Sequence, residues 1–160
     1  MHIRFLTTGG TIDKVYFDAL SDYEVGDSPI NQILAEGLVA FDFDVVPISQ
    51  KDSLEMTEDD RQALYDHIVG DDKAHYVITH GTDTMPETAE KLASIEGKTI
   101  VLTGALTPAR FRTTDAIFNI GMAVAAVQTA AAGVYIAMNG QVFDAGKVRK
   151  NRAENRFERT

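Results

Sequence analysis

The stretch His75–Thr88, which reads HYVITHGTDTMPET, decides the fold because it joins a short apolar strand, a glycine turn and a helix start. Tyr76–Ile78 is an uninterrupted β-favouring run, as expected of a strand buried on both faces of a parallel sheet. Gly81 lets the backbone turn, and Pro86 is typical of the first turn of a helix. The stretch therefore predicts one strand-to-helix unit of an α/β fold.

Hydroxyl and carboxylate side chains make this turn a candidate site. Thr82, Asp83 and Thr84 lie at the carboxyl end of the strand, where open α/β sheets bind ligands. The alternative is that one of them merely caps the next helix. A second threonine-rich turn, Thr7–Asp13, follows the apolar run Ile3–Leu6. Because β-branching restricts the backbone of threonine, its repeated use in tight turns favours a role for the hydroxyls.

Composition bounds the class of protein. A length of 160 residues predicts one domain over 1–160. The chain has no cysteine, which excludes disulfides and thiolate chemistry and suits a reducing compartment. A net charge of −9 argues against nucleic-acid binding. No stretch approaches the ~18 apolar residues of a membrane span, so we expect a cytoplasmic protein without membrane contact.

The basic residues are concentrated at the carboxyl end. Lys147–Thr160 has six basic and two acidic residues, a charge of +4, which leaves −13 on the rest of the chain. Such a tail could dock on its own fold or on a neighbouring subunit. The alternative, which we favour for the last few residues, is a solvated, frayed terminus.

Strands and helices alternate along the remaining sequence. The expected strands are residues 3–6, 41–48, 76–78, 99–102, 133–138 and 141–143, and the expected helices are 30–38, 61–69, 86–95 and 115–131. Thr57 with Asp60 predicts a helix cap, and Asn139–Gly140 predicts a hairpin turn. Residues 14–26 have no clear period and are expected to form an ordered loop. The apolar stripe of the last helix is expected to be core, through Ile117, Ile120, Val124 and Val127.

This order of elements predicts a three-layer α/β sandwich with a mostly parallel central sheet and a C-terminal β-hairpin. The loops at the carboxyl ends of the first four strands then share one edge. Those loops contain Thr11, Ser53, Thr82, Asp83 and Ala105.

The chemistry available at this edge favours a threonine nucleophile, because hydroxyls, an acid and a lysine occur without cysteine or an obvious catalytic histidine. A hydroxyl needs a base within hydrogen-bond reach, and Lys150 is the candidate. A solvated lysine is the alternative. Asp83 would orient the base or hold a substrate cation. Backbone N–H groups at Gly10 or Gly81 would stabilise an oxyanion.

Other kinds of site have less support. The Thr8–Thr11 turn lacks the lysine of a phosphate-binding loop, and no dinucleotide fingerprint is present. The four histidines show no metal-ligand spacing, so we expect neither a metal nor another cofactor. His80 lies beside the site, either as support for its residues or, the reading we favour, as a hydrogen-bonded structural histidine.

Two motifs resemble the signatures of bacterial-type L-asparaginases. They are Thr8–Ile12 (TGGTI) and His80–Met85 (HGTDTM), and Gly104-Ala105 with Phe118-Asn119 resembles the family's following segment. The resemblance implies hydrolysis of asparagine, and sometimes glutamine, to the acid and ammonia. The family usually carries a second, carboxyl-terminal domain, so we expect a short, single-domain form in which a neighbour's acidic contact is missing or replaced.

The resemblance also implies the catalytic roles. Thr11 matches the primary nucleophile, and Tyr23 is similar to the lid tyrosine that activates it, with Tyr16 as the competing candidate. Thr82 matches the second threonine, and Lys150 falls where the family completes a Thr-Lys-Asp triad. Which threonine acts first stays open.

The same resemblance implies the binding positions. Ser53 matches the serine that binds the substrate α-carboxylate, and Asp83 matches the aspartate that holds the α-ammonium. The full set of expected substrate-binding residues is Gly10, Asp52, Ser53, Gly81, Asp83 and Ala105. We therefore expect an L-asparagine amidohydrolase that forms a homodimer or homotetramer. The alternatives are a non-catalytic asparagine- or aspartate-binding module, and a glutaminase or other amide hydrolase.

Overall fold

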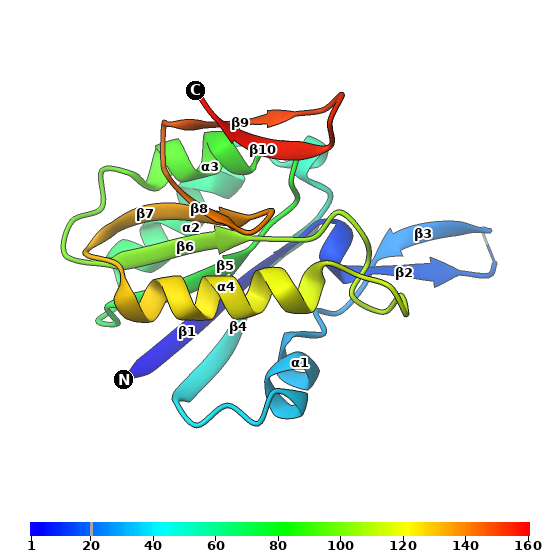
Figure 1. The fold of residues 1–160 in the computed structure, drawn as a ribbon, viewed down its shortest axis with the longest axis horizontal. Coiled ribbons are helices and arrows are strands. Elements are labelled where there is room, and N and C mark those ends of the chain that lie inside the picture. Colours follow the sequence, from blue (N-terminus) through cyan, green and yellow to red (C-terminus); the bar gives the residue numbers. More distant parts are fainter. Residues whose placement is uncertain (20) are drawn as a thin grey trace.

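The computed structural model, which describes residues 1–19 and 21–160, is a three-layer α/β fold (Figure 1). Its six-stranded sheet has the order β4-β1-β5-β6-β7-β8, in which β8 alone runs antiparallel to its neighbour. The sheet strands are β1 (His2–Gly9), β4 (Asp42–Lys51), β5 (His75–Thr79), β6 (Thr99–Thr103), β7 (Gly133–Met138) and β8 (Gln141–Asp144). The predicted fold class is confirmed.

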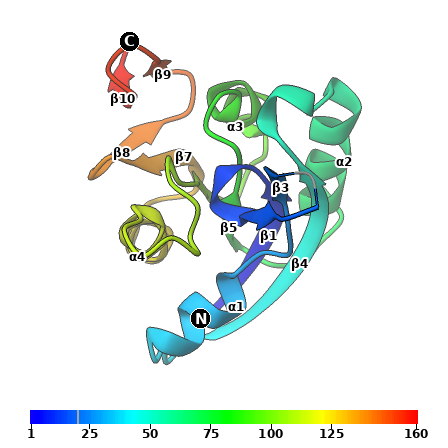
Figure 2. The same cartoon turned by 90° about the vertical axis from the view of Figure 1, so that its right-hand side faces the viewer.

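Four α-helices of the described residues cover the two faces of the sheet (Figure 2). They are α1 (Ile30–Glu36), α2 (Glu58–Val69), α3 (Met85–Leu92) and α4 (Ala116–Thr129). Side chains of α2 and α3 share one apolar cluster with the sheet, and those of α1 and α4 share another. None of the helices formed by the described residues is long and apolar enough for a membrane crossing.

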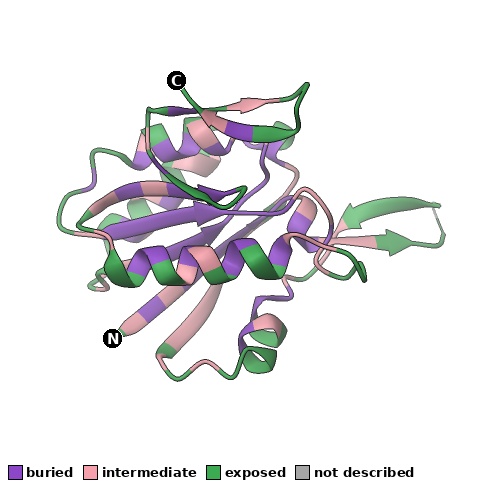
Figure 3. Ribbon diagram, viewed as in Figure 1, coloured by how far each residue is buried: buried purple, intermediate pink, exposed green. Residues whose placement is uncertain are grey.

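The central strands have uninterrupted apolar runs, with threonine or histidine only at their ends, because both of their faces are covered. In β5, Tyr76, Val77 and Ile78 are fully buried, and all five residues of β6 are buried (Figure 3). Pairing is in register, with Val77 opposite Phe5 on one side and Val101 on the other. These strands therefore fix the loops that follow them.

Two local signals in the sequence are confirmed. Thr57 and Asp60 form a reciprocal capping box at the start of α2. Asn139 and Gly140 turn the chain between β7 and β8 with positive φ angles of 53° and 75°, as expected of a tight hairpin turn.

The prediction of an ordered loop over residues 14–26 is wrong for its described part, which forms two strands. Strands β2 (Lys14–Phe17) and β3 (Asp22–Val25) form an antiparallel hairpin that projects from the body (Figure 1), while residue 20 lies outside the described residues. Tyr16 pairs with Tyr23 across the hairpin, with ring centroids 5.4 Å apart. Pairing of the two tyrosine rings therefore stabilises these strands, although the sequence shows no alternation of apolar and polar residues that would have predicted them.

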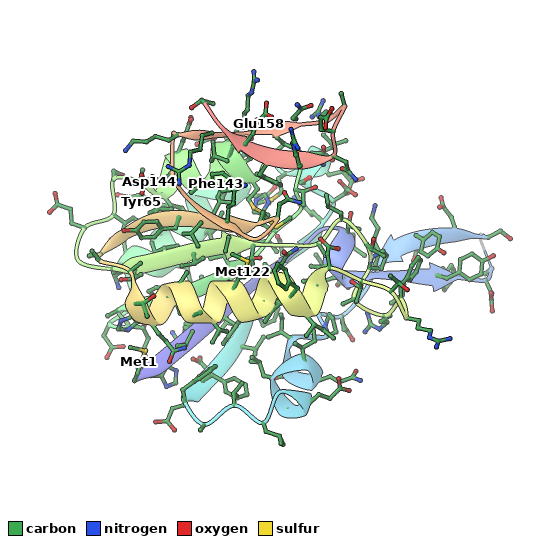
Figure 4. All side chains as sticks on the ribbon, viewed as in Figure 1. Met1, Tyr65, Met122, Phe143, Asp144 and Glu158 are labelled. Atoms are coloured by element: carbon green, nitrogen blue, oxygen red, sulfur yellow. The ribbon has the colours of Figure 1, made fainter. Side chains whose placement is uncertain are left out.

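The prediction of a frayed carboxyl terminus is also wrong. Strands β9 (Val148–Asn151) and β10 (Arg156–Arg159) form a second hairpin, with Glu158 on β10 and Phe143 on the nearby β8 (Figure 4). Phe157 is 1% exposed and belongs to the same apolar cluster as Phe143. Its backbone N–H donates to Asn139 Oδ1 over 2.8 Å. The tail therefore docks on its own fold.

The predicted core stripe of the last helix is partly wrong, because Ile117 is 57% exposed. The buried face of α4 is rotated from the expected stripe and consists of Ala116, Asn119, Ile120, Ala123, Ala126 and Val127. Ile120 and Val127 of the expected stripe are therefore core, Val124 is half-buried, and alanines take part of the face that the prediction gave to larger side chains.

His80 ties the end of β5 to α3. Its ring is fully buried, with Nδ1 2.7 Å from the Gly81 carbonyl oxygen and Nε2 2.8 Å from Thr88 Oγ1. Because a carbonyl only accepts, Nδ1 carries the proton and Nε2 accepts from the hydroxyl. Burial lowers the pKa of His80 to about 4. The structural role predicted for this histidine is confirmed.

Truncation of Phe157 tests the docked tail. We expect Phe157→Ala to lower the free energy of unfolding by about 3–5 kcal/mol, because it removes a buried ring from the core cluster. The neighbouring Arg156→Ala should change it by less than about 0.5 kcal/mol, since Arg156 is exposed. Urea unfolding measures both, and equal stability of the two variants would contradict the docking of this hairpin.

The buried histidine predicts a pH dependence of stability. The folded pKa of His80 is below its usual 6.5, so the unfolded chain takes up the proton first and stability falls as pH decreases from about 6.5 to 4. We expect wild type to lose about 3 kcal/mol more than His80→Gln around pH 4, relative to neutral pH. Parallel stability curves for the two proteins would show that the ring stays accessible to protons.

Candidate functional site

Four loops meet at one edge of the sheet because β1, β4, β5 and β6 are parallel. The turn after β1 contains the 3₁₀ helix η1 (Thr11–Asp13), and the loop after β4 contains η2 (Ser53–Glu55). The HGTDT loop follows β5. The shared edge predicted from the sequence is therefore present.

The loops are held together by close backbone approach at two glycines. A Cβ on Gly10, whose φ is +88°, would clash with Gly81, and a Cβ on Gly81 would clash with Ser53. Both glycines are buried. Their expected role as substrate-binding positions stays a prediction. The close contact explains why both positions require a residue without a side chain.

Ser53 forms the link between the second and third loops. Its hydroxyl accepts from the Asp83 backbone N–H over 3.3 Å, and its carbonyl oxygen accepts from Thr84 Oγ1 over 2.8 Å. Thr84 is the N-cap residue of α3 but makes no side-chain cap hydrogen bond. The interpretation of this turn as a simple helix cap is therefore wrong.

Lys150 completes a cluster with Thr82 and Asp83, which we name the Thr82–Asp83–Lys150 cluster. Its Nζ donates to Thr82 Oγ1 over 2.8 Å and to Asp83 Oδ1 over 2.9 Å. The Lys150 side chain is only 11% exposed, so the alternative of a solvated lysine is wrong. Strand β9 brings this lysine to the HGTDT loop, and Arg152 Nε adds a second cation 3.4 Å from Asp83 Oδ1.

A hollow of about 600 Å³ opens beside this cluster. Asp83 and Lys150 line it together with Arg152, with Glu87 and Glu90 of α3, and with other residues of β9. The cluster is therefore accessible to a small polar molecule.

Thr11 lies on η1 and is half-buried. Within the described part of the chain its hydroxyl makes no hydrogen bond, so the side chain is free to meet a ligand. The turn itself is fixed, because Asp13 N–H donates to Gly10 O over 3.1 Å and Ile12 O accepts from Ala109 N–H over 3.1 Å.

The two candidate lid tyrosines lie side by side on the β2–β3 hairpin. Tyr23 is 45% exposed and packs on Phe111 with ring centroids 5.7 Å apart. Tyr23 also lines a hollow of about 390 Å³ with Asp52, whereas Tyr16 does not line it. No hydrogen bond among the described residues joins Tyr23 to Thr11. The geometry thus favours Tyr23 over Tyr16 as the lid tyrosine, but the two residues Tyr23 and Thr11 are not in hydrogen-bond contact.

Asp52 and Ala105 differ in accessibility. Asp52 pairs with Lys14 Nζ over 2.9 Å and accepts from Leu54 N–H. Partial burial opposes ionisation of Asp52, but these partners hold its pKa below the usual value. Ala105 is 1% exposed and belongs to the core beside α4, so it offers almost no surface here.

Three residues that shape the site were missed from the sequence. Asp115 accepts from the Leu106 and Thr107 backbone N–H groups and thereby shapes the loop after β6. Lys14 neutralises Asp52, and Arg152 neutralises Asp83. Asp115 immediately precedes a helix, but its side chain makes no cap hydrogen bond there, so its position in the sequence did not indicate its contacts with the loop. The contacts of Lys14 and Arg152 likewise depend on tertiary structure. The described residues contain no group of three or more acidic or histidine side chains that could hold a metal ion.

Comparison with known proteins identifies a family model and a relative that match almost the whole chain. The family model "Asparaginase, N-terminal" matches residues 2–158. A glutaminase-asparaginase from Pseudomonas aeruginosa is 32% identical over 92% of this chain and 45% of its own length.

Solved structures agree with this match. The thermostable L-asparaginase from Thermococcus kodakarensis superposes with a TM-score of 0.85 at 24% identity, and a probable cytoplasmic L-asparaginase from Campylobacter jejuni with 0.80 at 30% identity. Each comparison covers 99% of this chain and 51% of the solved chain. This chain therefore spans about half the length of these relatives, and it belongs to the asparaginase family, of which it matches the N-terminal part.

Proposed function

We propose that the protein hydrolyses the side-chain amide of L-asparagine to L-aspartate and ammonia. The observation that carries the proposal is the Thr82–Asp83–Lys150 cluster, in which one lysine nitrogen contacts both a hydroxyl and a carboxylate. A base within hydrogen-bond reach is what a threonine hydroxyl needs for nucleophilic or proton-transfer chemistry. Family membership supports the same reaction type.

The substrate's two charged groups provide its orientation. The α-ammonium is placed against the Asp83 carboxylate, and the α-carboxylate against Ser53 and neighbouring backbone N–H groups. The Asp83 backbone N–H donates to the Ser53 hydroxyl over 3.3 Å, so these two residues are held next to each other before substrate binds. Such preorganisation lowers the entropic cost of orienting the amide.

Thr11 is the proposed nucleophile. Its oxygen attacks the amide carbon, its proton passes to a base, and the leaving nitrogen departs as ammonia after protonation. The resulting β-aspartyl ester is cleaved by water, which returns the threonine hydroxyl and releases aspartate. Lys150, together with Thr82, activates that water or assists the first attack. Tyr23 would contribute to activation of Thr11 by approaching it when substrate binds.

L-glutamine is the second candidate substrate, because the Pseudomonas aeruginosa relative is named a glutaminase-asparaginase. The homodimer or homotetramer and the cytoplasmic location remain predictions. A module that binds asparagine without hydrolysis has less support, because binding through Ser53 and Asp83 does not require a buried lysine on Thr82.

Single substitutions of the two threonines and the lysine test the mechanism. We expect Thr11→Ala, Thr82→Ala and Lys150→Gln each to lower kcat for ammonia release from L-asparagine by at least about 10³-fold, because each removes a nucleophile or a proton-transfer group. The matched control is Lys147→Gln, an exposed lysine of the same tail, which should keep wild-type turnover. L-glutamine is assayed in parallel.

The outcomes separate the candidates. Near-normal turnover in Thr11→Ala with loss in Thr82→Ala would make Thr82 the attacking residue. Turnover of neither amide by wild type, with a rise in Tm on addition of asparagine, would replace the hydrolase with the binding module. Unchanged circular dichroism spectra of the variants are needed to attribute any loss to chemistry.

A further inference from the structure

A third hollow, of about 240 Å³, lies between the base of the β2–β3 hairpin and the end of β4. Its lining includes Thr7, Asp13, Gly26, Ser28 and Ser49, and contains no member of the Thr82–Asp83–Lys150 cluster. Several of the lining residues carry oxygen atoms, whereas Pro47 and Ile48 add an apolar side.

Asp13 is the unusual group in this lining. Its side chain is 2% exposed, yet Oδ1 has no hydrogen-bond partner among the described residues. Ser28 Oγ is likewise buried without a hydrogen bond among the described residues, although it lies close enough to Asp13 to favour the ionised carboxylate. Buried polar atoms are nearly always paired, and a hydroxyl does not balance the charge of a buried carboxylate, so Asp13 indicates a missing partner of opposite charge.

Among the described residues, the cations Arg110 and Lys14 make their hydrogen bonds and ion pairs elsewhere. Arg110 is near enough to favour the ionised form of Asp13, but its Nη2 donates to the Asp27 carbonyl oxygen over 3.0 Å. Lys14 is engaged by Asp52 over 2.9 Å. Burial outweighs both the Ser28 hydroxyl and Arg110 and raises the pKa of Asp13 to about 7. Asp27 also lines the hollow and adds negative charge.

We propose that this hollow binds a monovalent cation, such as K⁺, Na⁺ or ammonium, through the Asp13 carboxylate and the hydroxyl and carbonyl oxygens around it. A single buried carboxylate balances one positive charge, whereas divalent ions are usually held by more than one acidic ligand. Nitrogen and sulfur ligands for a transition metal are absent from the lining. The volume accommodates a partly hydrated ion.

The position of Asp13 gives the cation a structural effect. Asp13 lies on η1, two residues after Thr11, and its backbone oxygen accepts from the Gly26 N–H over 2.8 Å. Gly26 follows directly after β3, so one bound ion joins the Thr11 turn to the base of the hairpin that carries Tyr23. This proposal does not depend on the proposed amidohydrolase activity.

Thermal unfolding of the intact protein in different chloride salts tests the proposal. At equal ionic strength near pH 8, the Tm in KCl, NaCl or NH₄Cl should exceed that in choline chloride by about 3–5 °C at roughly ten times the dissociation constant. The three salts distinguish K⁺, Na⁺ and ammonium. Hydrogen exchange at the Gly26 amide should slow in the same salts.

Two variants assign the effect to the site. Asp13→Asn keeps the shape of the side chain and removes its charge, so the salt-specific shift should vanish. Asp18→Asn, which removes an exposed charge on the hairpin, should retain it. If Asp13→Asn does not fold, Ser28→Ala should show a reduced shift instead.

Two results would overturn the proposal. One is the same Tm and Gly26 exchange in all four salts, which would mean that the hollow contains water only. The other is a salt-specific shift that persists in Asp13→Asn, or in Ser28→Ala where Asp13→Asn does not fold, which would place the cation elsewhere.

Discussion

Close backbone contact at glycines is the constraint on which the site depends. The turn after β1 rests against the loop after β5 at Gly10 and Gly81, and Gly81 in turn rests against Ser53 in the loop after β4. A methyl group at either glycine would push these loops apart. The absence of a side chain at these glycines therefore fixes the relative positions of Thr11, the Ser53 hydroxyl and the HGTDT loop.

Local patterns predicted the sheet because each central strand is uniformly apolar and ends in a distinctive turn. They failed where order comes from distant partners. The strand β10 has one apolar residue, Phe157, whose burial depends on a core built mainly by earlier parts of the chain. The β2–β3 hairpin depends on pairing of Tyr16 with Tyr23. In α4 the stripe was misplaced because alanines, rather than Ile117, face the sheet.

The candidate site was predictable to a similar extent. Turn chemistry located Thr11 and the HGTDT loop, because hydroxyls and glycines at strand ends are visible in the sequence. Lys150 was identified mainly by resemblance, since only the tertiary fold brings β9 to Thr82. Asp13 gave no signal at all. A carboxylate after a threonine turn looks like an ordinary surface residue until its 2% exposure is known.

The Lys150–Asp83 ion pair is better explained by chemistry than by stability. The Lys150 side chain is 11% exposed and that of Asp83 is 30% exposed, so both charges lose much of their hydration. Attraction between partly buried charges often does no more than offset this loss, and apolar residues of similar volume would stabilise the contact as well. Arg152 already supplies Asp83 with a cation that remains hydrated. A second, buried lysine that also contacts Thr82 therefore adds little to folding, which supports the proposal that it acts as a proton-transfer group beside this hydroxyl.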